Sequence, residues 1–261
     1  MHLYYLKSGV TQEEILDRTK YYHRYTANIS YKKNGVFSSS NYTDEDINKI
    51  TVRRSLYSGN KPSIGNANAA EMEIEFTNYD LTEEMLFYED SKENQVIIYL
   101  YCNFYEIESN SRVAGLSEEV FFSDKIEISS EEGKVVFHAY DALGNANKQF
   151  VEDQNMIYML HEPYNILENI AYQLGIQLNE NSNVSASDFD YLTPSYMKLS
   201  FTDTMYELLC ILATLLFGNF VIQNGTLKLI KIFDLPAETF YLIDEYGNCI
   251  MFGDDRILTR A

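Results

Sequence analysis

The sequence predicts an α+β fold that is mainly β, in which a β-barrel domain precedes a small α+β domain. Short runs of β-branched and aromatic residues, separated by turn signals, fill residues 24–140 and are typical of a β-barrel or a sandwich. After Gly144 the apolar residues take helical spacing, which indicates a second domain of another class. Twenty-two tyrosines and fifteen phenylalanines, with no tryptophan, suit a β-rich protein because these residues favour half-buried strands.

Length and composition bound the class of protein. The 261 residues suggest two domains and a fragment of a third, and 46% hydrophobic residues with only four prolines indicate a folded chain. Cys102, Cys210 and Cys249 lie far apart and form neither a zinc pattern nor a disulfide framework. The N-terminus lacks the pattern of a signal peptide, and the most apolar run, Leu208–Phe220, is too short to span a bilayer. We therefore expect no membrane association.

The net charge of −19 argues against direct nucleic-acid binding, because phosphate contacts draw on Lys and Arg. It also disfavours docking on anionic membranes. Two interpretations stay open: the charge keeps the protein soluble, or it lines a surface that faces DNA without binding it.

Residues 1–23 are expected to form an N-terminal helical arm. Thr11 and Glu14 have the spacing of a capping box, and this predicts a short helix over 11–23. The helix would cover a barrel mouth or pack against a neighbouring subunit.

The barrel domain is expected to span residues 24–150. A hairpin turning at Lys33-Asn34-Gly35 opens it, and residues 38–48 are expected to be a loop. The further strands are expected at 51–57, 71–76, 95–105, 115–122, 126–128 and 135–140. Between the second and third of these runs a helical turn is predicted at Leu81–Tyr88. The small residues Asn66–Ala70, preceded by Gly65, suggest close backbone approach at a tight corner of the barrel.

Residues 151–235 are expected to form an α+β domain with two helices and a hairpin. One helix is predicted at Ile166–Leu174 and ends at Gly175. A second is capped by Thr202 or Thr204, of which Thr204 has capping-box spacing with Glu207. Asn224-Gly225 predicts a type I′ hairpin turn. Residues 236–261, with turn signals at 246–248 and 252–254, are expected to begin a further domain, complete or truncated.

No catalytic, cofactor-binding or metal-binding residue is predicted, and we expect no enzyme. His138 and Asp141 lie close in sequence, but no nucleophile elbow accompanies them, so a structural His–Asp contact at a strand end is expected. Asp141 is expected to accept backbone N–H bonds in an Asx-type turn. The run Asp44–Asp46 lacks calcium-loop spacing. Three acidic pairs, at 83–84, 118–119 and 131–132, are expected to be solvated surface rather than glycosidase carboxylates.

An ordered series of motifs carries a resemblance to a known family. The motifs are a Ser-Leu-x-Ser strand at 55–58, Ile-Gly-Asn-Ala-Asn-Ala-Ala-Glu-Met-Glu-Ile-Glu-Phe at 64–76, Ala-Tyr-Asp-Ala-Leu at 139–143 and Gly-Asn-Phe-Val-Ile at 218–222. Over about residues 24–235 the chain resembles the tail-hub (baseplate-hub) proteins of bacteriophages and phage-tail-like particles, of the late control gene D type.

The resemblance implies a structural protein of the virion tail, assembled in the bacterial cytoplasm. It implies a homotrimer whose barrels surround a channel, bound to the tail tube or distal tail protein and to a tail tip or spike. DNA would pass without stable binding. Two alternatives stay open: a tail-associated peptidoglycan hydrolase, and a carbohydrate-binding β module with tyrosine platforms.

Overall fold

A computed structural model of the chain describes residues 3–11, 13–33, 36–56, 63–86, 88, 95–116, 118–151, 162–192, 203–232, 239–241, 251–252, 255–256 and 258–260. Contacts between Cα atoms divide the chain into two compact units, and the chain passes between them more than once. The first unit holds residues 1–55, 68–145 and 222–226, and the second holds residues 56–67, 146–221 and 227–261. The sequence predicts residues 56–67 inside the barrel domain, but in the structure they belong to the second unit.

One large antiparallel sheet forms the first unit. Its strands are β1 (Leu3–Leu6), β2 (Tyr21–Lys33), β3 (Val36–Tyr42), β4 (Ile47–Arg53), β6 (Glu71–Thr77), β7 (Ile97–Glu106), β8 (Arg112–Leu116), β9 (Glu119–Ser129) and β10 (Lys134–Tyr140). The order runs β3-β2-β7-β9-β10-β6-β4, and β8 and β1 continue from the far half of β7. Among the described strands no pairing joins β3 to β4, so the sheet is open there. The fold is mainly β, and the predicted closure into a barrel is not confirmed.

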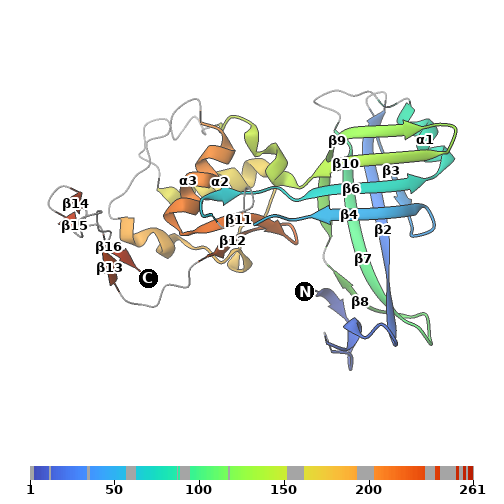
Figure 1. Ribbon diagram of the computed structural model, residues 1–261, viewed down its shortest axis with the longest axis horizontal. Helices are drawn as coiled ribbons and strands as arrows, with labels where there is room; N and C mark the ends of the chain where they lie inside the picture. Colours follow the sequence, from blue (N-terminus) through green and yellow to red (C-terminus); the bar gives the residue numbers. More distant parts are fainter. Residues whose placement is uncertain are drawn as a thin grey trace. The chain divides into compact units, whose positions relative to one another are not determined.

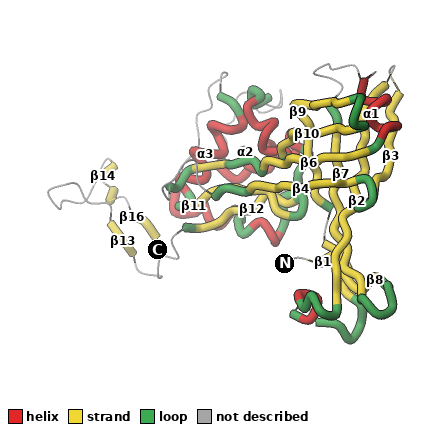
Figure 2. The backbone as a smooth tube through the Cα atoms, turned by 45° about the vertical axis from the view of Figure 1, so that its right-hand side comes forward, coloured by secondary structure: helices red, strands yellow, loops and turns green. Residues whose placement is uncertain are grey.

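The sheet folds over its own core. Figure 1 shows β4, β6, β10 and β9 crossing in front of β2 and β7, and Figure 2 shows β1 and β8 at the far end of that second layer. Alternation along the strands turns one set of side chains inward. On β6 these are Met72, Ile74 and Phe76, as predicted, and they pack with Phe137 of β10 and Ile98 of β7.

The N-terminal arm differs from its prediction. Thr11 and Glu14 do form a reciprocal capping box, with Thr11 N–H donating to Glu14 at 2.8 Å and Glu14 N–H donating to Thr11 at 3.2 Å. Only a 3-10 turn follows, at Glu14–Leu16, and β2 already begins at Tyr21. The predicted helix over 11–23 is wrong because pairing of β2 with β7 extends to Tyr21, opposite Glu106, and outweighs the local helix signal.

Of two further predicted segments, one is confirmed and one is wrong. The predicted helical turn near Leu81 is confirmed as α1 (Tyr79–Leu86), which packs against β9 and β10, and the side chain of Asn78 accepts the N–H of Leu81 at its start. Residues 38–42, expected to be loop, instead belong to β3. Their polar side chains are tolerated because every second one faces solvent at the end of the sheet.

The second unit combines helices with a small sheet. Its described elements are α2 (Pro163–Leu174), α3 (Met205–Leu215), β5 (Asn66–Ala67), β11 (Gly218–Gln223) and β12 (Thr226–Lys231), with 3-10 helices at Glu180–Ser182 and Ala186–Leu192. Residues 222–226, where β11 turns into β12, are grouped with the first unit, and a further 3-10 helix at Ala142–Asn147 spans the boundary in sequence. The small sheet has the order β12-β11-β5, with β5 parallel to β11.

The end signals of this unit are confirmed. Gly175 ends α2 in the left-handed conformation, and Thr204 and Glu207 cap α3 reciprocally. Asn224 and Gly225 both have positive φ, as a type I′ turn requires.

Four short strands complete the description: β13 (Thr239–Tyr241), β14 (Met251–Phe252), β15 (Asp255–Arg256) and β16 (Leu258–Arg260). β13 pairs with β16 and β14 with β15. The predicted turns at 246–248 and 252–254 lie outside the described residues, apart from Phe252. No helix in the described ranges is both long and apolar enough to cross a bilayer.

Candidate functional site

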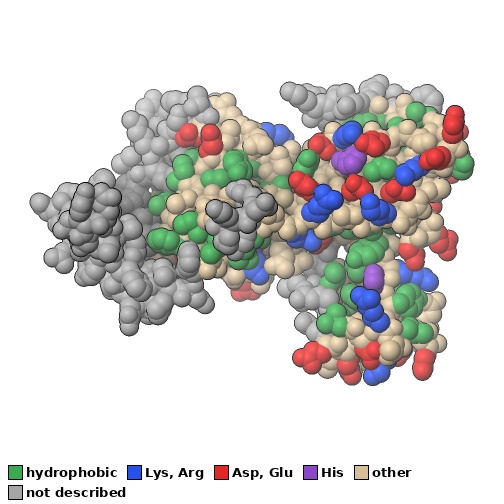
Figure 3. Space-filling view, in the orientation of Figure 1, with side chains coloured by type: hydrophobic (Ala, Val, Ile, Leu, Met, Phe, Trp, Pro, Cys, Tyr) green, Lys and Arg blue, Asp and Glu red, His purple; other side chains and the backbone are tan. Residues whose placement is uncertain are grey.

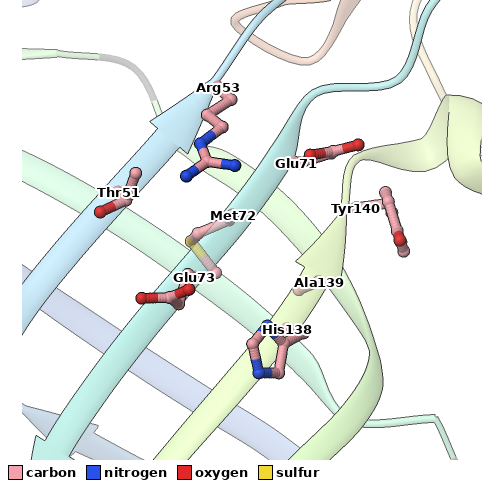
Figure 4. A pocket seen from close by; sticks show the side chains of 8 residues that line it. All are labelled: Thr51, Arg53, Glu71, Met72, Glu73, His138, Ala139 and Tyr140. Carbon is pink, nitrogen blue, oxygen red and sulfur yellow. The ribbon is translucent and has the colours of Figure 1, made fainter.

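The outer face of the large sheet carries charged residues in rows around His138. The register places Thr51 of β4, Glu73 of β6, His138 of β10 and Lys125 of β9 in one row across four strands. Residues that face each other across antiparallel strands share a face of the sheet. A shallow pocket of about 140 Å³ lies here, lined by Thr51, Arg53, Glu71, Met72, Glu73, His138, Ala139 and Tyr140 (Figure 4).

Ion pairs connect these rows. Lys49 Nζ lies 2.9 Å from Glu73, Lys134 Nζ lies 3.0 Å from Glu75, and Lys125 Nζ lies 2.5 Å from Glu127. The side-chain hydrogen bonds from these lysines hold the pKa of Glu73, Glu75 and Glu127 below the ordinary value of a glutamate. Figure 3 shows basic and acidic side chains intermixed over this face. Exposed pairs of this kind contribute little to stability because water screens them.

His138 lies beside a carboxylate. Its Nε2 lies 3.3 Å from Glu127, a carboxylate that already accepts a hydrogen bond from Lys125. The expected contact between His138 and Asp141 is not made, because Asp141 lies past the end of β10 and turns its carboxylate to backbone N–H groups. The only hydroxyls among the pocket-lining residues belong to Thr51 and Tyr140. Together these side chains give this face of the sheet a charged surface.

Asp141 is buried in the first unit and joins two backbone segments by hydrogen bonds, an arrangement that we call a clamp. One of its carboxylate oxygens accepts the N–H of Ala70 at 2.9 Å, and the other accepts the N–H of Leu143 at 3.0 Å. The predicted Asx-type role is therefore confirmed. Burial raises the pKa of Asp141 to about 6, while the two backbone N–H groups act in the opposite direction. Ala70 follows the return of the chain from the second unit and Leu143 precedes its next departure, so Asp141 ties both points together.

Asn219 makes the corresponding clamp in the second unit. Its side chain is fully buried, and its oxygen accepts the N–H of Asn66 at 2.9 Å. Its amide donates to the carbonyls of Leu56 at 2.6 Å and Ser63 at 2.8 Å. Sequence reasoning missed this role, although an asparagine inside an apolar strand is an unusual choice that could have drawn attention to it.

Gly65 lies in the same segment and explains the run of small residues. Its φ is +81°, and a Cβ built on it would lie 2.2 Å from Oγ1 of Thr214 in α3. The close approach that the sequence predicts is confirmed, but its partner is a helix of the second unit and not a barrel corner. Asn66 and Ala67 pair with β11, beside that helix.

The other candidate residues have structural partners. Asp46 accepts hydrogen bonds from Thr43 N–H and the Asn78 amide, and Asp44 lies 3.4 Å from Arg24. Within the described ranges no group of three or more metal-ligating side chains occurs. Of the acidic pairs, Glu84 accepts from Tyr31, Glu118 accepts from Tyr101 and Glu119 pairs with Arg54 at 2.6 Å. Cys102 and Cys210 are free thiols.

Aromatic side chains gather at the far end of β2 and β7. Tyr22 and Tyr105 stack with their ring centres 5.6 Å apart, and the guanidinium of Arg24 lies 5.2 Å and 5.5 Å from the two rings. The rings pack against each other, and Arg24 lies over them while it also pairs with Asp44, so the cluster joins the end of β2 to β7 and to the turn after β3.

Comparison with known proteins finds similarity in structure and none in sequence. No family profile and no curated protein matches the sequence. The crystal structure of the 43 kDa tail protein of prophage MuSo2 from Shewanella oneidensis is similar to this chain with a TM-score of 0.39 and 13% identity over 78% of the chain. The chain spans 55% of the length of that structure.

Proposed function

We propose that this protein is a structural subunit of the tail hub of a phage or phage-tail-like particle. The observation that carries the proposal is the role of the motif residues on which the hub resemblance rests. Asn66, Ala70, Asp141 and Asn219 all come from those motifs, and all serve two buried hydrogen-bonded clamps. Residues of this kind maintain a scaffold and take no part in a reaction.

The proposed mechanism is assembly. Three copies would form a ring around the tail channel and join the tail tube or distal tail protein to the tip or spike. Acidic side chains that face the channel would repel passing DNA phosphate, in keeping with the net charge of −19. The interleaved charges around His138 suit a solvated or subunit-facing surface, because such rows set register and partner choice more than affinity.

Light scattering after size-exclusion chromatography, followed by negative-stain imaging, tests this proposal. The expected result is a three-fold ring with an open centre. A hydrolytic activity on peptidoglycan that is lost in His138→Ala, or a single copy at every concentration, would contradict it.

A further inference from the structure

The large sheet has three free strand edges in the described part of the chain, and they differ in how they are protected. β1, β3 and β4 each pair on one side only. Natural sheets prevent unwanted pairing at an edge with charges, bulges, prolines or short strands. β1 has only four residues and an irregular register at Leu3–Tyr5, and β4 has an irregular register at Ile47–Lys49 and carries Lys49 and Arg53.

β3 has none of these protections. Its seven residues, Val-Phe-Ser-Ser-Ser-Asn-Tyr, include no charge and no proline, and they pair with β2 without a register shift. Val36 and Phe37 are exposed over 68% and 71% of their surface. An uncharged, regular edge that presents large apolar side chains is a template for another strand.

The backbone geometry of β3 fixes which groups point outward. Lys33 faces Val36 across a connection of two residues, and such hairpins close with a pair that exchanges both backbone hydrogen bonds. Every second residue then directs its N–H and C=O away from β2. On β3 these residues are Phe37, Ser39 and Asn41.

The net charge of the chain and the charged residues near β3 favour one kind of partner strand. At net −19, two copies of the chain repel each other, and the repulsion is least where neither contact strand is charged. The surroundings of β3 are also polarised. Lys32, opposite Phe37 on β2, lies at one end, and the turn Asp44–Asp46 follows the other, where Arg24 neutralises only one of its three carboxylates. An antiparallel copy of β3 would bring the basic end of each chain beside the acidic end of the other, whereas a parallel copy would bring like charges together.

We propose that β3 is a self-association edge at which a second copy of this chain adds its own β3 antiparallel, with Ser39 facing Ser39. In this register Phe37 of each copy faces Asn41 of the other, and the outward N–H and C=O groups of both strands pair. The contact is two-fold and uses both β3 edges, so it closes as a dimer instead of growing into a fibre. It does not rest on the proposed tail role, because a ring with three-fold symmetry needs a different contact.

Ser39→Pro tests the pairing directly. Proline at this position removes one outward N–H from each copy and leaves the ladder to β2 intact. We expect the dimer dissociation constant, measured by sedimentation equilibrium of the full chain, to rise about tenfold or more, because each copy leaves an edge carbonyl without its donor. Ser39→Ala is the matched control and should leave the constant within about twofold. Circular dichroism melting establishes that each variant is folded.

A charge swap tests the orientation. Lys32→Glu and Glu45→Lys should each weaken the dimer, and the double variant should restore it, because the exchanged charges at positions 32 and 45 again attract each other across the contact. Lys49→Glu, on the protected β4 edge, is the control and should have no effect on association. A single copy at all concentrations, a trimer insensitive to Ser39→Pro, an open-ended aggregate, or a charge swap without rescue would each overturn the proposal. A trimer insensitive to Ser39→Pro would overturn the β3 proposal and support the three-fold tail ring.

Discussion

Polar side chains are buried and bonded to the backbone at the two clamps, whereas on the outer face of the sheet they are exposed and contact other side chains. Asp141 and Asn219 are buried, and each satisfies backbone groups of segments far apart in sequence. Glu73, Glu127 and His138 are partly or fully exposed, and their partners are other side chains whose charges water also screens. A buried donor or acceptor without a partner costs much more than an exposed one, because no water replaces the lost bond.

This difference changes which residues are important. His138 has carboxylates beside it and is the residue most suggestive of chemistry, yet its Nε2 is buried and makes no hydrogen bond to the described residues. Asn219 suggests no chemistry, yet it satisfies three backbone groups of the segment 56–66. We therefore expect stability to depend steeply on the clamps and weakly on the outer face.

The largest effect is expected at Asn219. Asn219→Ala leaves the N–H of Asn66 and the carbonyls of Leu56 and Ser63 without their partner, so the free energy of unfolding should fall by about 4 kcal/mol. Urea denaturation followed by circular dichroism measures this. Asn179→Ala is the matched control, since Asn179 is exposed and accepts the N–H of Asn181 at a helix start. It should cost about 1 kcal/mol. Equal losses at both positions would remove the distinction between the buried and exposed regions.

The next largest effect is expected at Asp141, whose contribution to the free energy of unfolding should fall as pH rises. Its pKa is raised from 3.8 to about 6, so the folded state holds this proton over a pH range in which the unfolded state has released it. The stabilising contribution is therefore complete below pH 3.8 and is lost as pH rises through 6. The loss amounts to about 3 kcal/mol.

Denaturation of the wild type and Asp141→Asn between pH 4 and 7 isolates this contribution. The stability of the wild type relative to the variant should fall as pH rises over this range. Glu73, Glu75 and Glu127 act in the opposite direction, because their pKa values are lowered and their contributions are lost as pH falls. A relative stability that is flat or rises with pH would contradict the buried, raised-pKa description of Asp141.

A smaller effect is expected at Gly65. Gly65→Ala combines a left-handed φ with a contact to Thr214, and we expect a loss of about 2 kcal/mol in thermal or chemical denaturation. Gly175→Ala is the control in the same unit, because its φ is also positive but nothing lies within 4 Å of the added Cβ. It should lose only about 1 kcal/mol. Adding Thr214→Ala to Gly65→Ala should recover part of the difference, and no recovery would mean that the contact with α3 is unimportant.

The smallest effect is expected at His138. His138→Ala should change the free energy of unfolding by no more than about 0.5 kcal/mol, because Glu127 keeps its hydrogen bond to Lys125 and Nε2 of His138 makes no hydrogen bond to the described residues that could be lost. The same denaturation experiment in low and high salt checks this. A loss as large as that at Asn219 would show that the outer face is a second structural centre.

The sequence by itself determined the local elements. Alternation predicted β6 and the apolar run predicted β7, the capping box at Thr204 predicted the start of α3, and Asn224-Gly225 predicted the hairpin turn, because each of these signals acts over a few residues. The role of Asp141 could also be predicted, since an Asx-type turn needs only the next two residues.

Tertiary structure alone decided the rest. The helix signal at 11–23 yielded to strand pairing with β7, which no local pattern announces. The segment 56–67 joined the second unit through Asn219 and Thr214, more than 140 residues away, and so the small residues around Gly65 serve a helix and not a barrel corner. The polar residues 38–42 likewise predict a loop, although in the structure they belong to the edge strand β3. Contacts between residues far apart in sequence fix these features, and a single sequence encodes such contacts only through the packing of the whole chain.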